Sequence, residues 1–223
     1  MATDEALLDE VVGSGGAFLR LYRWDPPTLS VGRNQALEGV VRDDMPWVRR
    51  PTGGQAVWHE HEVTYAVAAP IAEFGSLRTA YKDIHGRIAR ALRSLGADVS
   101  VAPPANHPIR PSASPASCFA TSAGGEIIAD GRKLVGSAQV RRGDAFLQHG
   151  SILLDGSQPS AGNAEATLAA VLGRVVTFDE VVSAVIAAWG KPLASVSPVP
   201  SVPSVPSVPS VPSVAVVASL AQA

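Results

Sequence analysis

The sequence predicts an α+β fold in which helices flank a mixed, mainly antiparallel sheet. Two observations lead to this prediction. Short segments rich in β-branched and aromatic residues recur through much of the chain. A single long amphipathic segment, residues 77–95, separates two groups of them, whereas a regular parallel sheet would need a helix between most pairs of strands.

Six of these segments combine a short length with a β-rich composition, and we expect each to form a strand. They are residues 18–24, 47–50, 62–68, 126–130, 133–141 and 146–154. Residues 103–117 are rich in proline, serine and alanine, so we expect them to form a surface loop that leads to Cys118.

Helices are expected where apolar residues recur at intervals of three and four. Residues 77–95 have this pattern, and Ser76 is placed to cap the start of the helix and Gly96 to end it. Residues 178–189 follow Thr177, and a glutamate three positions after that threonine completes a capping-box pattern. Shorter helical patterns cover residues 4–12 and 163–172.

The composition is that of an ordinary globular protein. Apolar residues make up 46% of the 223 residues, and the net charge of −2 gives no general attraction to nucleic acid or to an anionic membrane. Cys118 is the only cysteine, which excludes an intrachain disulfide and a four-cysteine zinc site. The acidic first residues do not resemble a secretory signal, so we expect a cytoplasmic protein with a reduced thiol.

The composition changes after residue 192. From Ser197 the chain repeats Pro-Ser-Val, and proline at every third position fixes φ and removes backbone donors. Neither a helix nor a sheet can continue through such a repeat. We therefore expect one folded domain over residues 1–192 and a disordered, low-complexity tail over residues 193–223.

Two arginines lead from a predicted strand into a pair of glycines, in the segment from Arg49 to His59. Glycines let a ligand approach the backbone and expose N–H donors, and arginines bind carboxylates or phosphates in a forked geometry. A tight turn that carries solvated arginines would have the same composition. These residues alone leave both interpretations, an anion site and a turn, open.

Further candidates lie in three other segments. Lys133 begins a predicted strand and is followed by several small residues, and a His149–Gly150 step interrupts another predicted strand. Cys118 would need a nearby cation to act as a nucleophile, and Lys133 lies one predicted hairpin away. Each residue also has a structural interpretation, as an exposed hairpin lysine, a hydrogen-bonded histidine and a small buried thiol.

Other chemistries have little support in the sequence. His59 and His61 would share one face of a strand, but no third ligand follows at a recognisable spacing, so we expect no metal site. The chain lacks a G-x-x-x-x-G-K-[ST] loop, a G-x-G-x-x-G turn after a strand and a G-x-S-x-G elbow. Nothing in it therefore favours a P-loop NTPase, a Rossmann dehydrogenase or an α/β-hydrolase.

Taken together, the segments resemble the lipoate–biotin protein ligase and octanoyltransferase superfamily, in the family's order and over about residues 1–190. The matching segments are MATDEALL at 1–8, LSVGRNQ at 29–35, RRPTGGQAVWH at 49–59, EVTYAV at 62–67, CF at 118–119, GRKLVGSAQVRR at 131–142 and LQHGSILLD at 147–155. The resemblance implies a mainly antiparallel mixed sheet with packed helices, in agreement with the pattern above.

In this family the arginine–glycine segment and the lysine strand form the walls of an elongated acyl pocket. The resemblance implies that the pocket is lined by Arg50, Thr52, Gly53, Gly54, Gln55, Ala56 and His59 and, facing them, by Gly136, Ser137, Ala138, His149 and Gly150. The segment around Cys118 is most similar to the cysteine-dependent octanoyltransferases. There the cysteine is acylated and the lysine that corresponds to Lys133 is thought to lower its pKa.

The resemblance thus implies transfer of an octanoyl or lipoyl group from acyl carrier protein, through a thioester on Cys118, to a lysine of a lipoyl-domain protein such as the glycine cleavage H protein. No cofactor would be needed. Two alternatives stay open. An ATP-dependent lipoate–protein ligase would need ATP and Mg²⁺ and would tolerate loss of Cys118, and a non-catalytic family member would bind acyl groups or carrier proteins without turnover.

The chain departs from the family at both ends. Relatives carry a strand before the acidic first helix and further helices after the catalytic domain. Here the sequence starts at that helix and ends in the Pro-Ser-Val repeat. The resemblance therefore implies either a start further upstream or an uncovered sheet edge, which would favour aggregation.

Overall fold

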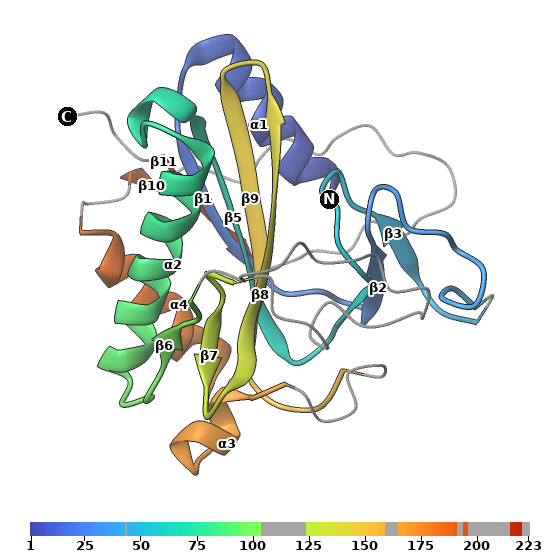
Figure 1. Cartoon of the computed structure of the whole chain (residues 1–223), viewed down its shortest axis with the longest axis vertical. Helices are drawn as coiled ribbons and strands as arrows, with labels where there is room; N and C mark the ends of the chain where they lie inside the picture. The colour runs from blue at the N-terminus through green and yellow to red at the C-terminus, as the bar shows by residue number, and fades with distance from the viewer. Residues whose placement is uncertain (43, 104–123, 159–164, 191–193, 196–214, 220–223) are drawn as a thin grey trace.

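The computed structural model describes residues 1–42, 44–103, 124–158, 165–190, 194–195 and 215–219 (Figure 1). The larger of its two sheets contains, in spatial order, β10 (Ala194–Ser195), β11 (Ala215–Ser219), β1 (Phe18–Tyr22), β5 (Glu62–Pro70), β9 (Ala145–Leu153), β8 (Arg132–Arg142), β7 (Ile127–Ala129) and β6 (Ser100–Val101). The smaller sheet contains β3 (Trp47–Arg49), β2 (Thr28–Val31) and β4 (Val57–His59). The helices are α1 (Ala2–Ser14), α2 (Leu77–Ser94), α3 (Leu168–Leu172), α4 (Phe178–Trp189) and the short 3₁₀ helix η1 (Ile71–Glu73).

The predicted fold class is confirmed. Among the described strand pairs only β2 with β3 is parallel, and all the others are antiparallel. All six predicted strands are present. The sequence did not predict β2, β4 and β6, which have four residues or fewer and are therefore too short to give a reliable periodic pattern.

The helices begin at the predicted caps. The Ser76 hydroxyl accepts the N–H of Thr79 at the start of α2. Thr177 and Glu180 form the reciprocal capping box of α4, and Gly190 ends that helix in the left-handed conformation. Helix α3 is shorter than predicted because Thr167 caps it, so that its first residue is Leu168.

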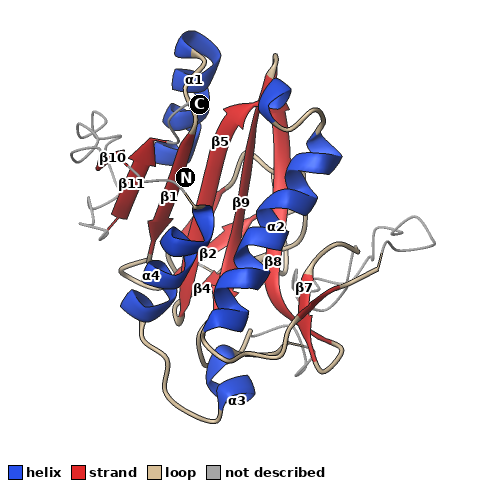
Figure 2. Cartoon of the chain, turned by 90° about the vertical axis from the view of Figure 1, so that its left-hand side faces the viewer, coloured by secondary structure: helices blue, strands red, loops and turns tan. Residues whose placement is uncertain are grey.

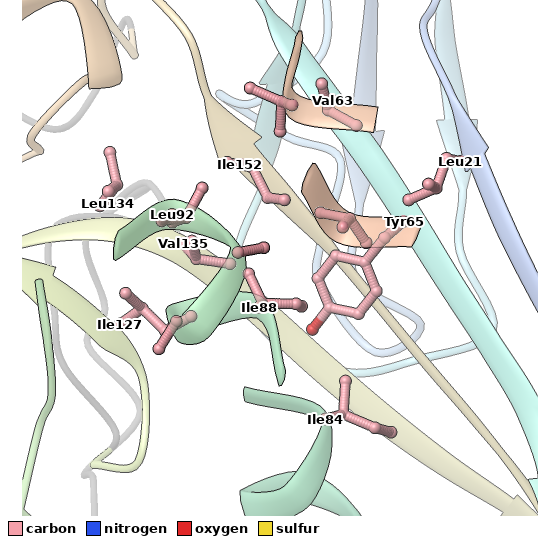
Figure 3. Close-up of a cluster of buried hydrophobic side chains, with 14 of the residues drawn as sticks. Leu21, Val63, Tyr65, Ile84, Ile88, Leu92, Ile127, Leu134, Val135 and Ile152 are labelled. Carbon is pink, nitrogen blue, oxygen red and sulfur yellow. The ribbon is translucent and has the colours of Figure 1, made fainter. Parts of the chain in front are cut away.

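The central strand β5 is buried on both faces and thereby separates two apolar clusters. Tyr65 faces the side covered by α2 and α4, and Ala66 faces the side covered by α1. Figure 3 shows Ile88 and Ile84 of α2 lying over Tyr65 and Ile152. Figures 1 and 2 show α2 and α4 on one side of the large sheet and the small sheet on the other. The small sheet therefore lies on the side of the large sheet that α2 does not cover.

Strand β11 differs from the expectation of a disordered tail. Its register with β1 joins Phe18 to Ser219 and Tyr22 to Ala215, and β10 adds a further strand outside it. The predicted disorder of the Pro-Ser-Val repeat lies outside the described residues. The segment after the repeat contains no proline until the end of the chain and includes two adjacent valines, which favour a strand. It pairs with the β1 edge that the resemblance left uncovered.

No described helix has the length and apolarity that crossing a bilayer requires.

Candidate functional site

A pocket lies between the small sheet and the face of the large sheet opposite α2. It encloses about 330 Å³ of space, part of which is open to solvent. Of the twelve residues that the resemblance places in an acyl pocket, seven line it: Arg50, His59, Gly136, Ser137, Ala138, His149 and Gly150. The sequence did not single out the other lining residues, Met1, Ser30, Val57, Thr64 and Ser151.

The other five predicted residues, Thr52 to Ala56, form the turn beside the pocket and are not among its lining residues. This turn lies against β2, because the Thr52 carbonyl accepts the backbone N–H of Arg33 at 2.8 Å. The approach is so close that a Cβ on Gly32 would lie 1.9 Å from the carbonyl oxygen of Gly54. Gly54 itself has φ 93°, a left-handed conformation that favours glycine.

Arg50 holds this turn in place. Its Nη2 donates to the carbonyls of Gly53 at 3.0 Å and Gln55 at 2.6 Å, and its Nη1 donates to the carbonyl and the hydroxyl of Ser30, both at 3.1 Å. The side chain is buried. The turn interpretation of the sequence is therefore the one that the described contacts favour, with a buried guanidinium rather than a solvated one.

A buried network surrounds His59. Its Nδ1 lies 2.6 Å from Glu62 Oε1 and its Nε2 lies 2.7 Å from Ser30 Oγ. Glu62 Oε1 also accepts the hydroxyls of Ser151, at 2.9 Å, and of Thr64. A carboxylate accepts only, so Nδ1 donates to Glu62, and in the tautomer with its proton on Nδ1 the ring accepts the Ser30 hydroxyl at Nε2.

A second network links His149 to the first helix. His149 Nε2 lies 2.7 Å from the Thr52 hydroxyl and its Nδ1 lies 3.4 Å from Asp4 Oδ2. Asp4 also accepts from Arg20 at 2.6 Å and from Tyr22 at 2.9 Å. Burial alone would raise the pKa of Asp4, but the His149 hydrogen bond and the charge of Arg20 outweigh it and lower that pKa. Burial lowers the pKa of His149.

These networks determine the chemistry of the pocket surface. The hydroxyls of Ser30, Thr64 and Ser151 are all engaged with neighbouring protein groups, and so are both histidine rings. The rest of the lining is Met1, Arg50, Ser137 and the small apolar residues Val57, Gly136, Ala138 and Gly150. Because the hydroxyls and rings named above already have protein partners, these parts of the wall suit an apolar ligand that brings no polar groups of its own.

Ser137 belongs to another hydrogen-bonded group on the opposite face of the large sheet. Its hydroxyl lies 2.6 Å from Tyr65 Oη and 2.8 Å from His85 Nε2. The Nδ1 of His85 donates to the Gly125 carbonyl, and burial lowers the pKa of this histidine to about 4. Since strand residues alternate between faces, the Ser137 side chain lies under α2 while the adjacent Gly136 and Ala138 face the pocket.

Lys133 is not among the lining residues. It is buried at the start of β8 and forms an ion pair with the buried Glu126, which the sequence did not single out. Lys133 is therefore not the exposed hairpin lysine that its position in the sequence allowed. Cys118 and its loop lie outside the described residues, so the predicted contact between the two side chains stays a prediction.

Two acids of these networks interrupt an apolar pattern in the sequence. Asp4 lies on the same helical stripe as Leu7, Leu8 and Val11, where an apolar residue is expected. Glu62 opens a strand that is otherwise apolar. An acid on an apolar face requires a buried partner, and both acids have one here.

The two histidines considered for a metal lie in different surroundings. His59 is buried, whereas the side chain of His61 is 60% exposed. The part of the chain that the structure describes contains no group of three or more histidine, cysteine, aspartate or glutamate side chains able to hold a metal ion.

Comparison with known proteins adds independent evidence. Residues 1–190 match the lipoyl protein ligase A/B catalytic domain. The octanoyltransferase LipM of Kyrpidia tusciae is 43% identical over 171 residues, which cover 70% of this chain and 61% of that protein. The octanoyltransferase LipM of Moorella thermoacetica is 44% identical over 165 residues, which cover 69% of this chain and 60% of that protein. The chain thus spans about 60% of the length of these relatives.

Solved structures give the same architecture. The Ta0514 protein of T. acidophilum superposes with a TM-score of 0.67 at 26% identity, over 84% of this chain and 77% of that one. A lipoate-protein ligase A bound with ATP superposes with a TM-score of 0.64 at 23% identity, over 82% of this chain and 77% of that one, which supports the fold alone.

Proposed function

Because the chain belongs to the lipoyl protein ligase A/B catalytic-domain family, we propose that it is an acyltransferase of protein lipoylation, which moves an octanoyl or lipoyl group to a lysine of a lipoyl-domain protein. The observation that carries this proposal is the pocket between the two sheets, where the hydroxyls of Ser30, Thr64 and Ser151 and the rings of His59 and His149 are bonded to protein groups. Most of the remaining lining is apolar, from Met1, Val57, Ala138 and two glycines. The two LipM relatives support octanoyl as the acyl group.

The reaction would proceed in two steps. The Cys118 thiolate attacks the thioester carbonyl of octanoyl-acyl carrier protein, so that a new carbon–sulfur bond forms, the old one breaks and the carrier leaves as its thiolate. The acceptor lysine, as the neutral amine, then attacks the enzyme thioester, the amide forms, the Cys118 thiolate is released and the amine proton passes to solvent. The first step exchanges one thioester for another at nearly equal energy and the second converts a thioester to a more stable amide, so neither step needs ATP. The positive charge of Lys133 would favour the thiolate form of Cys118.

The pocket would contribute binding and orientation. An apolar chain that enters it gives up contact with water, at roughly 25 cal/mol for each Å² of apolar surface buried. The wall is held by the hydrogen bonds of Arg50, Glu62 and Asp4, so little reorganisation would accompany ligand binding.

The test is to incubate the purified full chain with octanoyl-acyl carrier protein and an apo lipoyl domain, with and without ATP and Mg²⁺. We expect octanoylation of the lipoyl domain without nucleotide. We also expect an acyl adduct on Cys118 that neutral hydroxylamine removes and that the Cys118→Ala variant lacks. A strict need for ATP, with activity retained in Cys118→Ala, would instead identify a lipoate–protein ligase.

The non-catalytic alternative gives a third pattern. In that case the chain would bind the octanoylated carrier protein equally well with or without Cys118, and neither protein would transfer the acyl group. Intact-protein mass spectrometry of both proteins, combined with a binding measurement by calorimetry, separates this outcome from the other two.

A further inference from the structure

We propose that Ser30, His59 and Glu62 form a second acyl-accepting centre, in which the Ser30 hydroxyl takes an acyl group as an ester independently of Cys118. This inference rests on the proposed function in one respect, that the pocket binds an acyl chain, but it requires neither Cys118 nor a carrier protein. It assigns a chemical role to the buried network that the transfer mechanism leaves unused.

The geometry is that of a nucleophile, a base and a group that orients the base. Ser30 Oγ lies 2.7 Å from His59 Nε2, and His59 Nδ1 lies 2.6 Å from Glu62 Oε1. The bound proton on Nδ1 leaves Nε2 as the acceptor of the serine proton. This is the arrangement by which unrelated hydrolases activate a serine, and it is recognised by geometry and roles rather than by position in the sequence.

Two further contacts favour reaction at Ser30. Arg50 Nη1 lies 3.1 Å from Ser30 Oγ, so a fixed positive charge stands beside the oxygen that would become the nucleophile. A neighbouring cation favours the deprotonated form of a hydroxyl and stabilises negative charge that develops next to it. Ser30 and His59 both line the pocket, so an acyl chain held there brings its carbonyl to this wall.

The chain offers an internal comparison. Ser137 also contacts a histidine, His85, at 2.8 Å, but the other nitrogen of that ring faces the Gly125 carbonyl instead of a carboxylate. Burial lowers the pKa of His85 to about 4, which makes it a poor base at neutral pH, and this pair lies on the face of the sheet away from the pocket. Ser151 also lines the pocket, but it approaches His59 at Nδ1, 3.4 Å away, which is the nitrogen that faces Glu62. Among the described serine–histidine contacts at the pocket, Ser30 is the serine that meets the ring nitrogen opposite the carboxylate.

The step balances with an ester or thioester as donor and water as the final acceptor. Ser30 Oγ attacks the acyl carbon and its proton passes to His59 Nε2, while the imidazolium is stabilised by Glu62. The bond to the leaving group breaks, and the leaving group takes the proton from His59. Water then attacks the Ser30 ester by the same route, which releases the carboxylic acid and restores the hydroxyl.

The test uses the full chain carrying Cys118→Ala and a fluorophosphonate with an eight-carbon chain, which phosphonylates activated serines. We expect a single adduct that peptide mass spectrometry places on Ser30, together with hydrolysis of p-nitrophenyl octanoate that Ser30→Ala removes. His59→Gln should lower the labelling rate roughly a hundredfold, which is a typical contribution of a general base. His61→Gln, a change at an exposed histidine two positions away, should leave the rate unchanged.

Glu62 is tested as a positioning residue by comparing two substitutions. Its Oε1 lies 2.6 Å from His59 Nδ1, so the carboxylate orients the ring. Glu62→Gln keeps the size of the side chain but removes the carboxylate, so it should lower the labelling rate. Glu62→Asp keeps the carboxylate and should retain more of that rate, whereas a role in packing alone would give the reverse order.

The proposal is overturned if no adduct forms, if the adduct maps to Ser137 or to any other residue, or if Glu62→Gln labels at the same rate as the parent protein. Thermal unfolding of each variant shows whether it is folded. If His59→Gln does not fold, the proposal is still tested by the residue that is labelled and by the Ser30→Ala and Glu62→Gln variants. Failure here would leave nucleotide-independent transfer through Cys118 intact.

Discussion

At the scale of single residues, Asp4 on the first helix supports side chains that extend to the pocket, although it lies near the start of the sequence. Asp4 is completely buried and accepts from Arg20, Tyr22 and His149. Through His149 the same contacts reach the hydroxyl of Thr52. A change at the start of the chain is therefore transmitted to the turn beside the pocket.

We expect Asp4→Ala to destabilise the protein by about 3–5 kcal/mol, because it leaves the buried charge of Arg20 without its carboxylate. Asp9→Ala is the matched control. Asp9 lies on the same helix and pairs with Arg142, but both side chains are well exposed, so the loss should be at most about 1 kcal/mol. Urea denaturation of both variants measures the difference. Equal midpoints for the two would contradict the structural role of Asp4.

The buried histidines predict a pH dependence of stability. Burial lowers the pKa of His85 to about 4 in the folded protein, and it also lowers that of His149, whereas an unfolded histidine titrates near 6.5. As the pH falls below about 6.5 the unfolded chain binds protons that the folded protein does not, so stability falls between about pH 6.5 and pH 4.

For His85 alone this loss amounts to roughly 3 kcal/mol over that window. The His85→Gln variant should show a flatter dependence of the free energy of unfolding on pH in this range. The exposed His61 provides the control, since His61→Gln should keep the slope of the parent. A slope that His85→Gln does not change would show that the folded-state pKa of this histidine is near its ordinary value.

At the scale of elements, the glycines around the turn are not equivalent. A Cβ on Gly32 would lie 1.9 Å from the carbonyl oxygen of Gly54, whereas a Cβ on Gly53 would meet nothing within 4 Å. We therefore expect Gly32→Ala to destabilise the protein by about 1–3 kcal/mol. Gly53→Ala should change stability by less than about 1 kcal/mol. Chemical denaturation of the pair tests this, and a tolerant Gly32→Ala would mean that β2 and the turn can separate.

What the sequence could predict also depends on the element. The start of α2 at Ser76 and the capping box of α4 depend only on neighbouring residues, so the sequence predicts where both helices begin. Strands β2 and β4 have no such local signal, because each is defined by the other and by the turn that Arg50 holds. The same holds for the site. The resemblance identified His59 and His149, but their partners Ser30, Glu62 and Asp4 lie on other elements and needed the fold.

At the scale of the whole molecule, the large sheet is completed by a segment that follows the Pro-Ser-Val repeat. Strand β11 occupies the edge of β1 along its full length. An open edge of that kind would offer backbone groups to another copy of the chain. Strand β11 therefore covers an edge of the sheet that would otherwise be open.

Ala218 is suited to test this role, because it pairs with Leu19 of β1 on one side and with Ser195 of β10 on the other. Ala218→Pro should weaken the pairing of β11 and cause self-association that increases with concentration, measured by analytical ultracentrifugation. Val205→Pro, inside the proline-rich repeat, is the control and should sediment as the parent does. Identical sedimentation of all three proteins would show that the β1 edge needs no cover.

The contacts that hold the pocket also determine when it can form during synthesis of the chain. Asp4 and His149 are 145 positions apart, Thr52 and His149 are 97 apart, and Trp58 donates its backbone N–H to Gln158 across 100 positions. A nascent chain on the ribosome cannot close any of these contacts until strand β9 or the residues after it have emerged. Acyl binding should thus arise late in translation and all at once, and a ribosome stalled before strand β9 should carry a chain that holds no fatty ligand.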